Sequence, residues 1–194
     1  MGTRIGLAGR TMIDVAINWF LPEWAPNAHP LLVHFPIALL TTGVFFDLLG
    51  FALSQQMVWR HSGTALYVIG TALMGATYIT GREAAATVFT PGLAHGLVNE
   101  HWTWATFTLG YFTILTLGRL ATHGATIMRS RSTTTSHTTL DTITNVFSWR
   151  PALIQILFFV AGVGGLWLVM ETADRGGQLV YEYGVGVMPP PLTF

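Results

Sequence analysis

The chain has 194 residues, of which 51% are hydrophobic and only 9% are charged, whereas an average soluble domain carries about 25% charged residues. Nine arginines balance nine acidic residues, so the charge predicts no nucleic-acid partner. The chain has no cysteine, which excludes disulfides, iron–sulfur clusters and covalently attached c-type haem. This composition predicts an integral membrane protein whose surface largely faces the lipid bilayer.

Residues 1–28 form a separate N-terminal segment. Asp14 and Asn18 interrupt its apolar run, so it does not have the pattern of a secretory signal. Apolar residues recur at helical spacing over residues 10–21. This spacing favours an amphipathic helix in the membrane interface or, equally, a helix packed on the membrane domain at residues 29–175.

Four apolar stretches predict an all-α membrane protein with a four-transmembrane-helix bundle. At 1.5 Å per residue, the first is roughly 35 Å long, enough to cross a bilayer. Within it, Pro36 should free the carbonyl of Leu32 and bend the helix just beyond His34. Residues 81–83 are expected to end the second. No tandem repeat of 20 to 50 residues is visible. The predicted spans are residues 30–53, 62–80, 92–120 and 151–170.

Two non-membrane segments complete the predicted organisation. Residues 121–149 form a Thr-rich loop with too few apolar residues to bury itself. Residues 176–194 form an extended, glycine-rich C-terminal tail that returns to the end of the bundle where the chain enters. There it could cap a site with the hydroxyls of Tyr181 and Tyr183, or dock on a partner as an ordinary tail.

Arginines near the span ends predict the orientation. Five lie on the side of the inter-helix connections and four on the side of the termini. Arginine accumulates on the cytoplasmic side, so this bias places both termini outside. In a bacterial inner membrane, the outside is the periplasm.

Four histidines lie at the entrances of the first and third helices, which enter from the same side. His29 and His34 are five residues apart, and His95 and His101 are six. These spacings, about 7.5 and 9 Å along a helix, predict two layers, His29 with His95 and His34 with His101. Five and six steps also rotate a side chain by roughly 140° and 240°, so each helix presents at most one of its histidines to a given partner.

Opposed imidazoles from two helices are the axial ligands that a b-type haem requires. We expect His34 and His101 to be the ligands, with aromatic side chains such as Phe35 and Trp102 forming the walls of the slot. His29 and His95 would contact the propionates or form a second pair. The alternatives are histidines with a structural role only, with no cofactor, or a non-haem zinc or iron ion to which Glu100 adds a carboxylate.

Asp47 lies within the first predicted span. A carboxylate in a span is costly and normally faces the bundle interior. It could belong to a proton path, but the pattern favours an ion pair with Arg119 or Arg60, without indicating which of the two.

Several motifs stand in a fixed order along residues 29–187. They resemble those of a bacterial four-helix membrane family of unknown function whose members share an HPxxVHFPI signature. The resemblance implies four spans and functional roles for His29, His34, Asp47 and His101. It also implies a redox setting, because relatives look like companions of c-type cytochromes and respiratory modules. The motifs are HPLLVHFPIA at 29–38, Phe46-Asp47-Leu48, TGREAA at 80–85, Asn99-Glu100-His101 with Trp104-Ala105, and GQLVYEYGVG at 177–186.

The sequence thus favours a b-type cytochrome-like subunit that binds haem between its first and third helices. The second reading is a cofactor-free accessory subunit that scaffolds a larger respiratory or photosynthetic membrane complex. A metal-dependent enzyme ranks lowest, because the chain shows no nucleophile–base set and no phosphate-binding loop.

Overall fold

The computed structural model describes residues 28–53, 56–132 and 149–186, and the side chains of residues 28–53, 58–122 and 153–186. The predicted interfacial helix at 10–21 and the threonine run at 133–139 lie outside the described residues. The elements are α2 (His29–Leu32), α3 (His34–Ala52), α4 (Gln56–Thr87), the 3₁₀ turn η1 (Gly92–Ala94), α5 (His95–Ser132) and α7 (Trp149–Tyr181).

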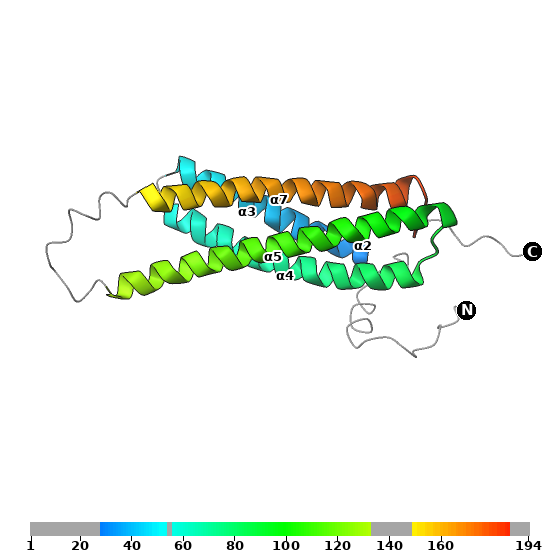
Figure 1. The fold of residues 1–194 in the computed structure, drawn as a ribbon, viewed down its shortest axis with the longest axis horizontal. Coiled ribbons are helices and arrows are strands. Elements are labelled where there is room, and N and C mark those ends of the chain that lie inside the picture. Colours follow the sequence, from blue (N-terminus) through cyan, green and yellow to red (C-terminus); the bar gives the residue numbers. More distant parts are fainter. Residues whose placement is uncertain (1–27, 54–55, 133–148, 187–194) are drawn as a thin grey trace, which may run out of the picture.

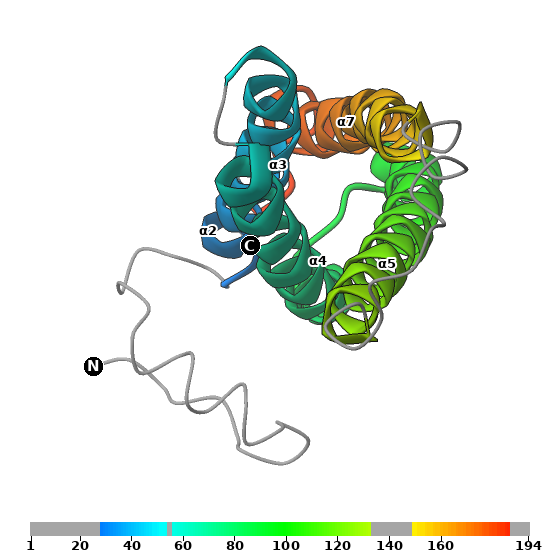
Figure 2. The same cartoon turned by 90° about the vertical axis from the view of Figure 1, so that its left-hand side faces the viewer.

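The long helices form one elongated antiparallel bundle (Figure 1). Seen along its axis, α3, α4, α5 and α7 follow one another around a square (Figure 2), and each contacts its two neighbours. Therefore α3 lies diagonally opposite α5, and α4 diagonally opposite α7. The short α2 continues the line of α3, so the first and third helices of the chain face each other across the axis.

The bundle is apolar outside and partly polar inside. Large apolar side chains are exposed on every long helix, for example Phe45 on α3, Ile79 on α4, Ile114 on α5 and Met170 on α7. Among the described side chains, seven polar or charged residues are buried, five of them threonines. A water-soluble bundle has the opposite arrangement. By length and composition, two stretches of the described residues could cross a membrane, His29–Ala52 and Leu153–Tyr181.

Glycines bring the helices close together around the core. Leu40, Tyr67 and Phe112 are fully buried at its centre. A Cβ on Gly70 of α4 would lie 2.9 Å from Leu40, and one on Gly165 of α7 would lie 2.6 Å from Phe112. Each large side chain therefore occupies the space that a missing Cβ provides, as expected where helices associate in lipid.

Three helices are longer than predicted. α4 continues past the expected end at residues 81–83 to Thr87, where alanines at 84–86 favour the helix. α5 runs to Ser132, so residues 121–132 of the predicted loop are helical. α7 starts at Trp149 and runs to Tyr181. The change from apolar to polar sequence therefore marks the end of the apolar stretch but not the end of the helix.

The prediction that residues 176–181 are extended is wrong, because they form the last turns of α7. Glycine lowers helix propensity by only about 1 kcal/mol, and the contacts of α7 with α5 outweigh that cost. The helix ends further on, where Gly184 and Gly186 have φ of 64° and 78°. Such left-handed residues terminate helices. Residues 187–194 lie outside the described residues.

Pro36 distorts the helix slightly earlier than predicted. The irregular residue is Val33, which separates α2 from α3 before His34 rather than beyond it. A proline ring clashes with the carbonyl four residues before it, here that of Leu32, and has no N–H to offer it. The distortion therefore falls between Leu32 and His34, and the next backbone bond, from Ile37 N to Val33 O, is stretched to 3.5 Å.

Candidate functional site

Two histidines meet across the axis at one end of the bundle. The rings of His29, on α2, and His101, on α5, have centroids 6.5 Å apart and planes at 83°. Edge-to-face aromatic pairs span about 4.5–7 Å, so this pair lies near the loose end of that range. Because α2 continues the line of α3, which lies diagonally opposite α5, the two rings approach each other through the centre of the bundle.

Each ring is held by a backbone carbonyl of a third helix. His29 Nδ1 lies 3.0 Å from the carbonyl oxygen of Thr77 on α4, and His101 Nδ1 lies 2.9 Å from that of Thr172 on α7. A carbonyl only accepts, so Nδ1 carries the hydrogen in both rings. In a neutral imidazole the lone pair is then on Nε2. Second-sphere bonds of this kind orient histidines that ligate metals.

A glycine lies against each ring. A Cβ on Gly81 of α4 would be 2.8 Å from Cε1 of His29, and a Cβ on Gly176 of α7 would be 3.1 Å from Cε1 of His101. Each glycine is four residues after the threonine whose carbonyl holds the ring. The imidazoles therefore lie directly on the backbones of α4 and α7, and a larger residue at either position would displace them.

The predicted pairing of the histidines is corrected by this arrangement. His29, rather than His34, lies beside His101. His34 is exposed, because five helical positions beyond His29 turn its side chain away from the axis. His95 is exposed too, and its Nδ1 lies 3.2 Å from the carbonyl oxygen of Gly92 in η1.

The aromatic residues expected to form the walls of the slot lie on the outside. Phe35 is 57% exposed and Trp102 is 43% exposed. Trp102 donates from Nε1 to the hydroxyl of Tyr78, and the guanidinium of Arg82 lies 5.0 Å from its ring centroid. Trp102 is therefore part of an exposed α4–α5 cluster.

The other predicted site residues are also placed away from the pair. Glu100 is exposed, with Oε2 3.7 Å from Nε of Arg175. Tyr181 is 89% exposed, so its hydroxyl does not cover the histidines, and Tyr183 is half-buried in the turn that ends α7. Across the described side chains, no group of three or more His, Cys, Asp or Glu residues could hold a metal ion.

The opposite end of the bundle carries a buried ion pair. Arg119 on α5 donates from Nη1 and Nη2 to the two carboxylate oxygens of Asp47 on α3, at 2.7 and 2.6 Å. The side chains are 5% and 7% exposed. The guanidinium also lies over the rings of Tyr67 and Phe158. Of the two arginines that the sequence left open, Arg119 is the partner of Asp47.

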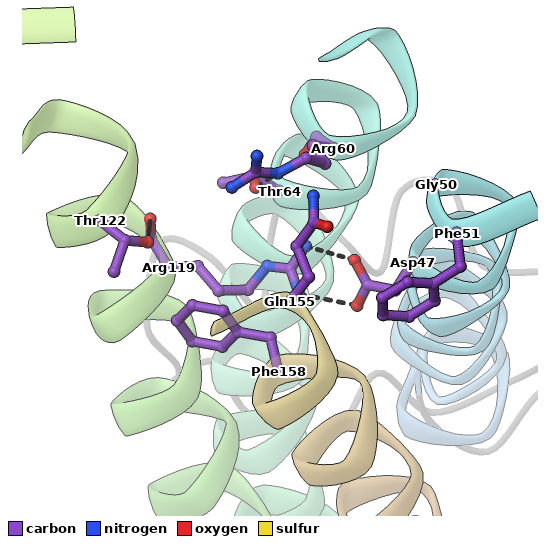
Figure 3. A pocket seen from close by; sticks show the side chains of 9 residues that line it. All are labelled: Asp47, Gly50, Phe51, Arg60, Thr64, Arg119, Thr122, Gln155 and Phe158. Carbon is purple, nitrogen blue, oxygen red and sulfur yellow. Dashed lines mark hydrogen bonds and ion pairs between the residues drawn. The ribbon is translucent and has the colours of Figure 1, made fainter. Parts of the chain in front are cut away.

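A second polar pair lies beside the first. With the amide oxygen of Gln155, on α7, turned toward Arg60, on α4, the guanidinium donates to it from Nε at 2.8 Å and from Nη1 at 3.1 Å. Figure 3 shows both pairs around one pocket. Each of the four long helices contributes one member of the two pairs.

The two hairpins, α2/α3 with α4 and α5 with α7, share these positions. Asp47 follows His29 by eighteen residues, as Arg119 follows His101, and both Leu40 and Phe112 lie eleven residues after their histidine. On the second helices, glycine stands eleven residues before Gly81 and before Gly176, and Arg60 and Gln155 stand twenty-one before. His29 contacts His101, Asp47 contacts Arg119, and Arg60 contacts Gln155. Leu40 and Phe112 belong to one core cluster. The hairpins are thus parallel structural repeats around one axis.

Comparison with known proteins gives a family but no relative of established function. No curated protein and no solved structure matches the chain. A family model described as "Predicted membrane protein (DUF2231)" matches residues 25–189, which include all of the bundle described above. The expectation of a membrane family without a known function is therefore confirmed, and the chain belongs to the DUF2231 family of membrane proteins.

Proposed function

We propose that this chain is a b-type haem-binding subunit that transfers electrons within a membrane complex, with His29 and His101 as the axial ligands. The observation that supports it is the approach of the two rings across the axis, at 6.5 Å between centroids. Their Nδ1 atoms already donate hydrogen bonds to the backbone carbonyls of Thr77 and Thr172. Both rings therefore have Nε2 as the ligating atom, in the orientation that such second-sphere bonds fix.

The number of ligands favours haem over a non-haem ion. Zinc sites in proteins use three or four protein ligands, whereas a porphyrin leaves only the axial positions to the protein. A pair of imidazoles is therefore a complete protein set for haem and an incomplete one for zinc. The bound haem would supply one-electron redox chemistry, and the chain's residues would hold it and set its surroundings.

Two glycines on α4 and α7, the second pair of diagonally opposite helices, support the same proposal. Gly81 and Gly176 leave no Cβ beside the rings of His29 and His101. The half-buried Trp104, three residues after His101 on α5, would shield that side of the ligands from water, whereas its edge-to-face neighbour Trp167 is 56% exposed. Exclusion of water raises the influence of the surrounding protein on a redox potential.

We further propose that all four long helices cross the membrane, in a bacterial inner membrane with both termini periplasmic. The exposed apolar residues on α4 and α5, and not only those on α3 and α7, support this topology. A carboxylate and a guanidinium within the spanning part of such a bundle must face its interior, as Asp47 and Arg119 do. The histidine pair would then lie toward the periplasmic face, where c-type cytochromes work.

Oxidised and reduced optical spectra of protein purified from its native membrane test the haem. We expect a reduced b-type band that disappears in His29→Ala and in His101→Ala. His34→Ala and His95→Ala are the matched controls and should retain it, because both side chains are exposed. A band that survives in both His29→Ala and His101→Ala would contradict the proposal, as would a featureless spectrum of the native protein.

One observation favours a second function, a cofactor-free accessory subunit. The Nδ1 bonds to Thr77 and Thr172 already give each imidazole a hydrogen-bonding partner without any cofactor. The exposed cluster of Trp102, Tyr78 and Arg82 would then be a contact surface for another membrane subunit. Purification with intact partners and no visible absorption would support this function, and crosslinking from position 102 would identify the neighbour.

A further inference from the structure

A polar pocket lies at the end of the bundle opposite the histidines (Figure 3). It lies near the ends of α3 and α4, because Asp47 is five residues before the end of α3 and Arg60 is four residues after the start of α4. The helix α5 continues from Arg119 to Ser132, beyond the pocket. All four long helices line it. The lining residues are Asp47, Gly50, Phe51, Arg60, Thr64, Arg119, Thr122, Gln155 and Phe158.

The lining residues carry more positive than negative charge. Arg119 and Asp47 neutralise each other through two hydrogen bonds. Arg60 is half-buried, and its partner in the pocket is the neutral amide oxygen of Gln155. A partly desolvated cation is stabilised far more by an anion than by a neutral dipole. The charge of the lining therefore favours one additional negative group.

A buried donor on one of the lining residues has no hydrogen-bonding partner among the described residues. It is the Nε–H of Arg119, whose side chain is only 5% exposed. An unpaired buried donor costs roughly 1–3 kcal/mol, and more when the group is charged. The orphaned donor and the unneutralised guanidinium of Arg60 belong to two residues that line one pocket.

The size of the pocket limits the ligand. The space open to the centres of water molecules is about 30 Å³, where a single buried water needs roughly 10–15 Å³. This space admits a small, charged, oxygen-bearing group and excludes a ring system such as a quinone head. In the membrane topology proposed above, the ends of α3 and α4 would lie near the phosphates of lipid headgroups.

We propose that this pocket binds one phosphate-type oxyanion, with Arg60 as the charge partner and the Arg119–Asp47 pair as its fixed floor. Arginine suits this role because its guanidinium presents several donors in a plane to phosphate oxygens. The same chemistry is offered by the phosphate of an acidic phospholipid and by free inorganic phosphate. The site is independent of the proposed haem, since it shares no residue with the histidine pair.

Thermal unfolding of the delipidated full-length protein in detergent tests the proposal. One arm adds inorganic phosphate, a second adds phosphatidylglycerol, and a third adds phosphatidylcholine, which has a phosphate but no net charge. At about 100 times Kd we expect a rise in Tm of roughly 5 °C or more. A rise with inorganic phosphate identifies the free ion as ligand, and a rise with phosphatidylglycerol alone identifies the lipid.

Variants assign the effect to the pocket. Arg60→Gln should abolish the rise in Tm, whereas Arg82→Gln, an exposed arginine near the opposite end, should keep it. If Arg60→Gln does not fold, Gln155→Glu replaces it, because a carboxylate there would neutralise Arg60 in place. We expect Gln155→Glu to raise the basal Tm and to lose the response. No rise in any arm, or an unchanged rise in the tested pocket variant, overturns the proposal.

Discussion

The two ends of the bundle axis are built from the same repeat positions but filled with different kinds of pairs. At one end the counterparts are identical, His29 with His101 and Gly81 with Gly176. At the other end they are complementary, Asp47 with Arg119. Complementary charges neutralise each other, so the charge of neither member needs a third component. Two identical neutral imidazoles carry no opposite charges to neutralise, so this pair is suited to the binding role proposed above.

This difference assigns separate roles to the two ends. The buried ion pair is expected to fix which helices are neighbours, since a carboxylate or a guanidinium left alone in a membrane interior is strongly unfavourable. The histidine pair is expected to contribute less to stability and more to binding. The following substitutions test that division, from the largest expected effect to the smallest.

Asp47→Asn should lower the free energy of unfolding by about 3–5 kcal/mol, because it leaves the guanidinium of Arg119 buried without a countercharge. Chemical denaturation in detergent measures the loss. The exchange variant, Asp47→Arg combined with Arg119→Asp, restores a complementary pair at equivalent repeat positions and should recover most of the stability. An exchange variant as unstable as Asp47→Asn would contradict the equivalence of the two hairpins.

Gly165→Ala should cost about 1–3 kcal/mol, because its Cβ would lie 2.6 Å from Cζ of the buried Phe112. The neighbouring Gly164→Ala is the matched control. Its Cβ would meet only the Tyr111 hydroxyl, at an ordinary 3.5 Å. Thermal unfolding of the two variants side by side checks the difference. Equal losses would mean that the close approach of α5 and α7 does not depend on this glycine.

Gly81→Ala should cost about 1 kcal/mol, less than Gly165→Ala, since the His29 ring can swing away from the new Cβ. That movement should break the bond to the Thr77 carbonyl and, if haem is bound, remove or shift the reduced band. Gly75→Ala, on the same helix with no atom within 4 Å of a new Cβ, should change neither. Spectra and melting curves of both variants distinguish an effect on binding from one on stability.

Thr71→Val should have the smallest effect. It removes the hydrogen bond between the hydroxyls of Thr71 on α4 and Thr116 on α5, at 2.9 Å. Interhelical bonds of this kind in membrane proteins average about 0.6 kcal/mol. The change belongs to neither end of the axis, so both the visible spectrum and the phosphate response should be unaffected. A loss above 2 kcal/mol would show that stability is distributed along the axis.

Much of the architecture could be predicted from local patterns. Apolar runs indicated the four helices, and the carboxylate of Asp47 within such a run indicated an interior ion pair. The helix ends could not be predicted as well, because helical backbone continues into polar sequence at Thr87 and Ser132. The glycine at 176 favoured an extended chain in the sequence. In the structure it is helical, and its missing Cβ leaves space for the His101 ring.

The histidine pairing depends on information that no local pattern contains. Depth along the axis can be estimated from residue spacing. The directions of the His29 and His34 side chains also depend on how α2 is rotated relative to α3 at the break at Val33. The repeat is hard to detect in the sequence because its shared positions are few and the offset differs between the first and second helices of each hairpin. His29 aligns with His101 and Asp47 with Arg119 at one offset, whereas Gly81 aligns with Gly176 and Arg60 with Gln155 only at another.

The direction of the two repeats has a consequence for how the molecule can work. Both hairpins enter from the same end, so the axis relating them runs along the bundle, as in parallel membrane repeats, rather than across it. Rotation about such an axis never exchanges inside with outside. If the bundle spans a membrane as proposed, its two ends are therefore never equivalent: the imidazoles face one compartment and the guanidinium groups the other.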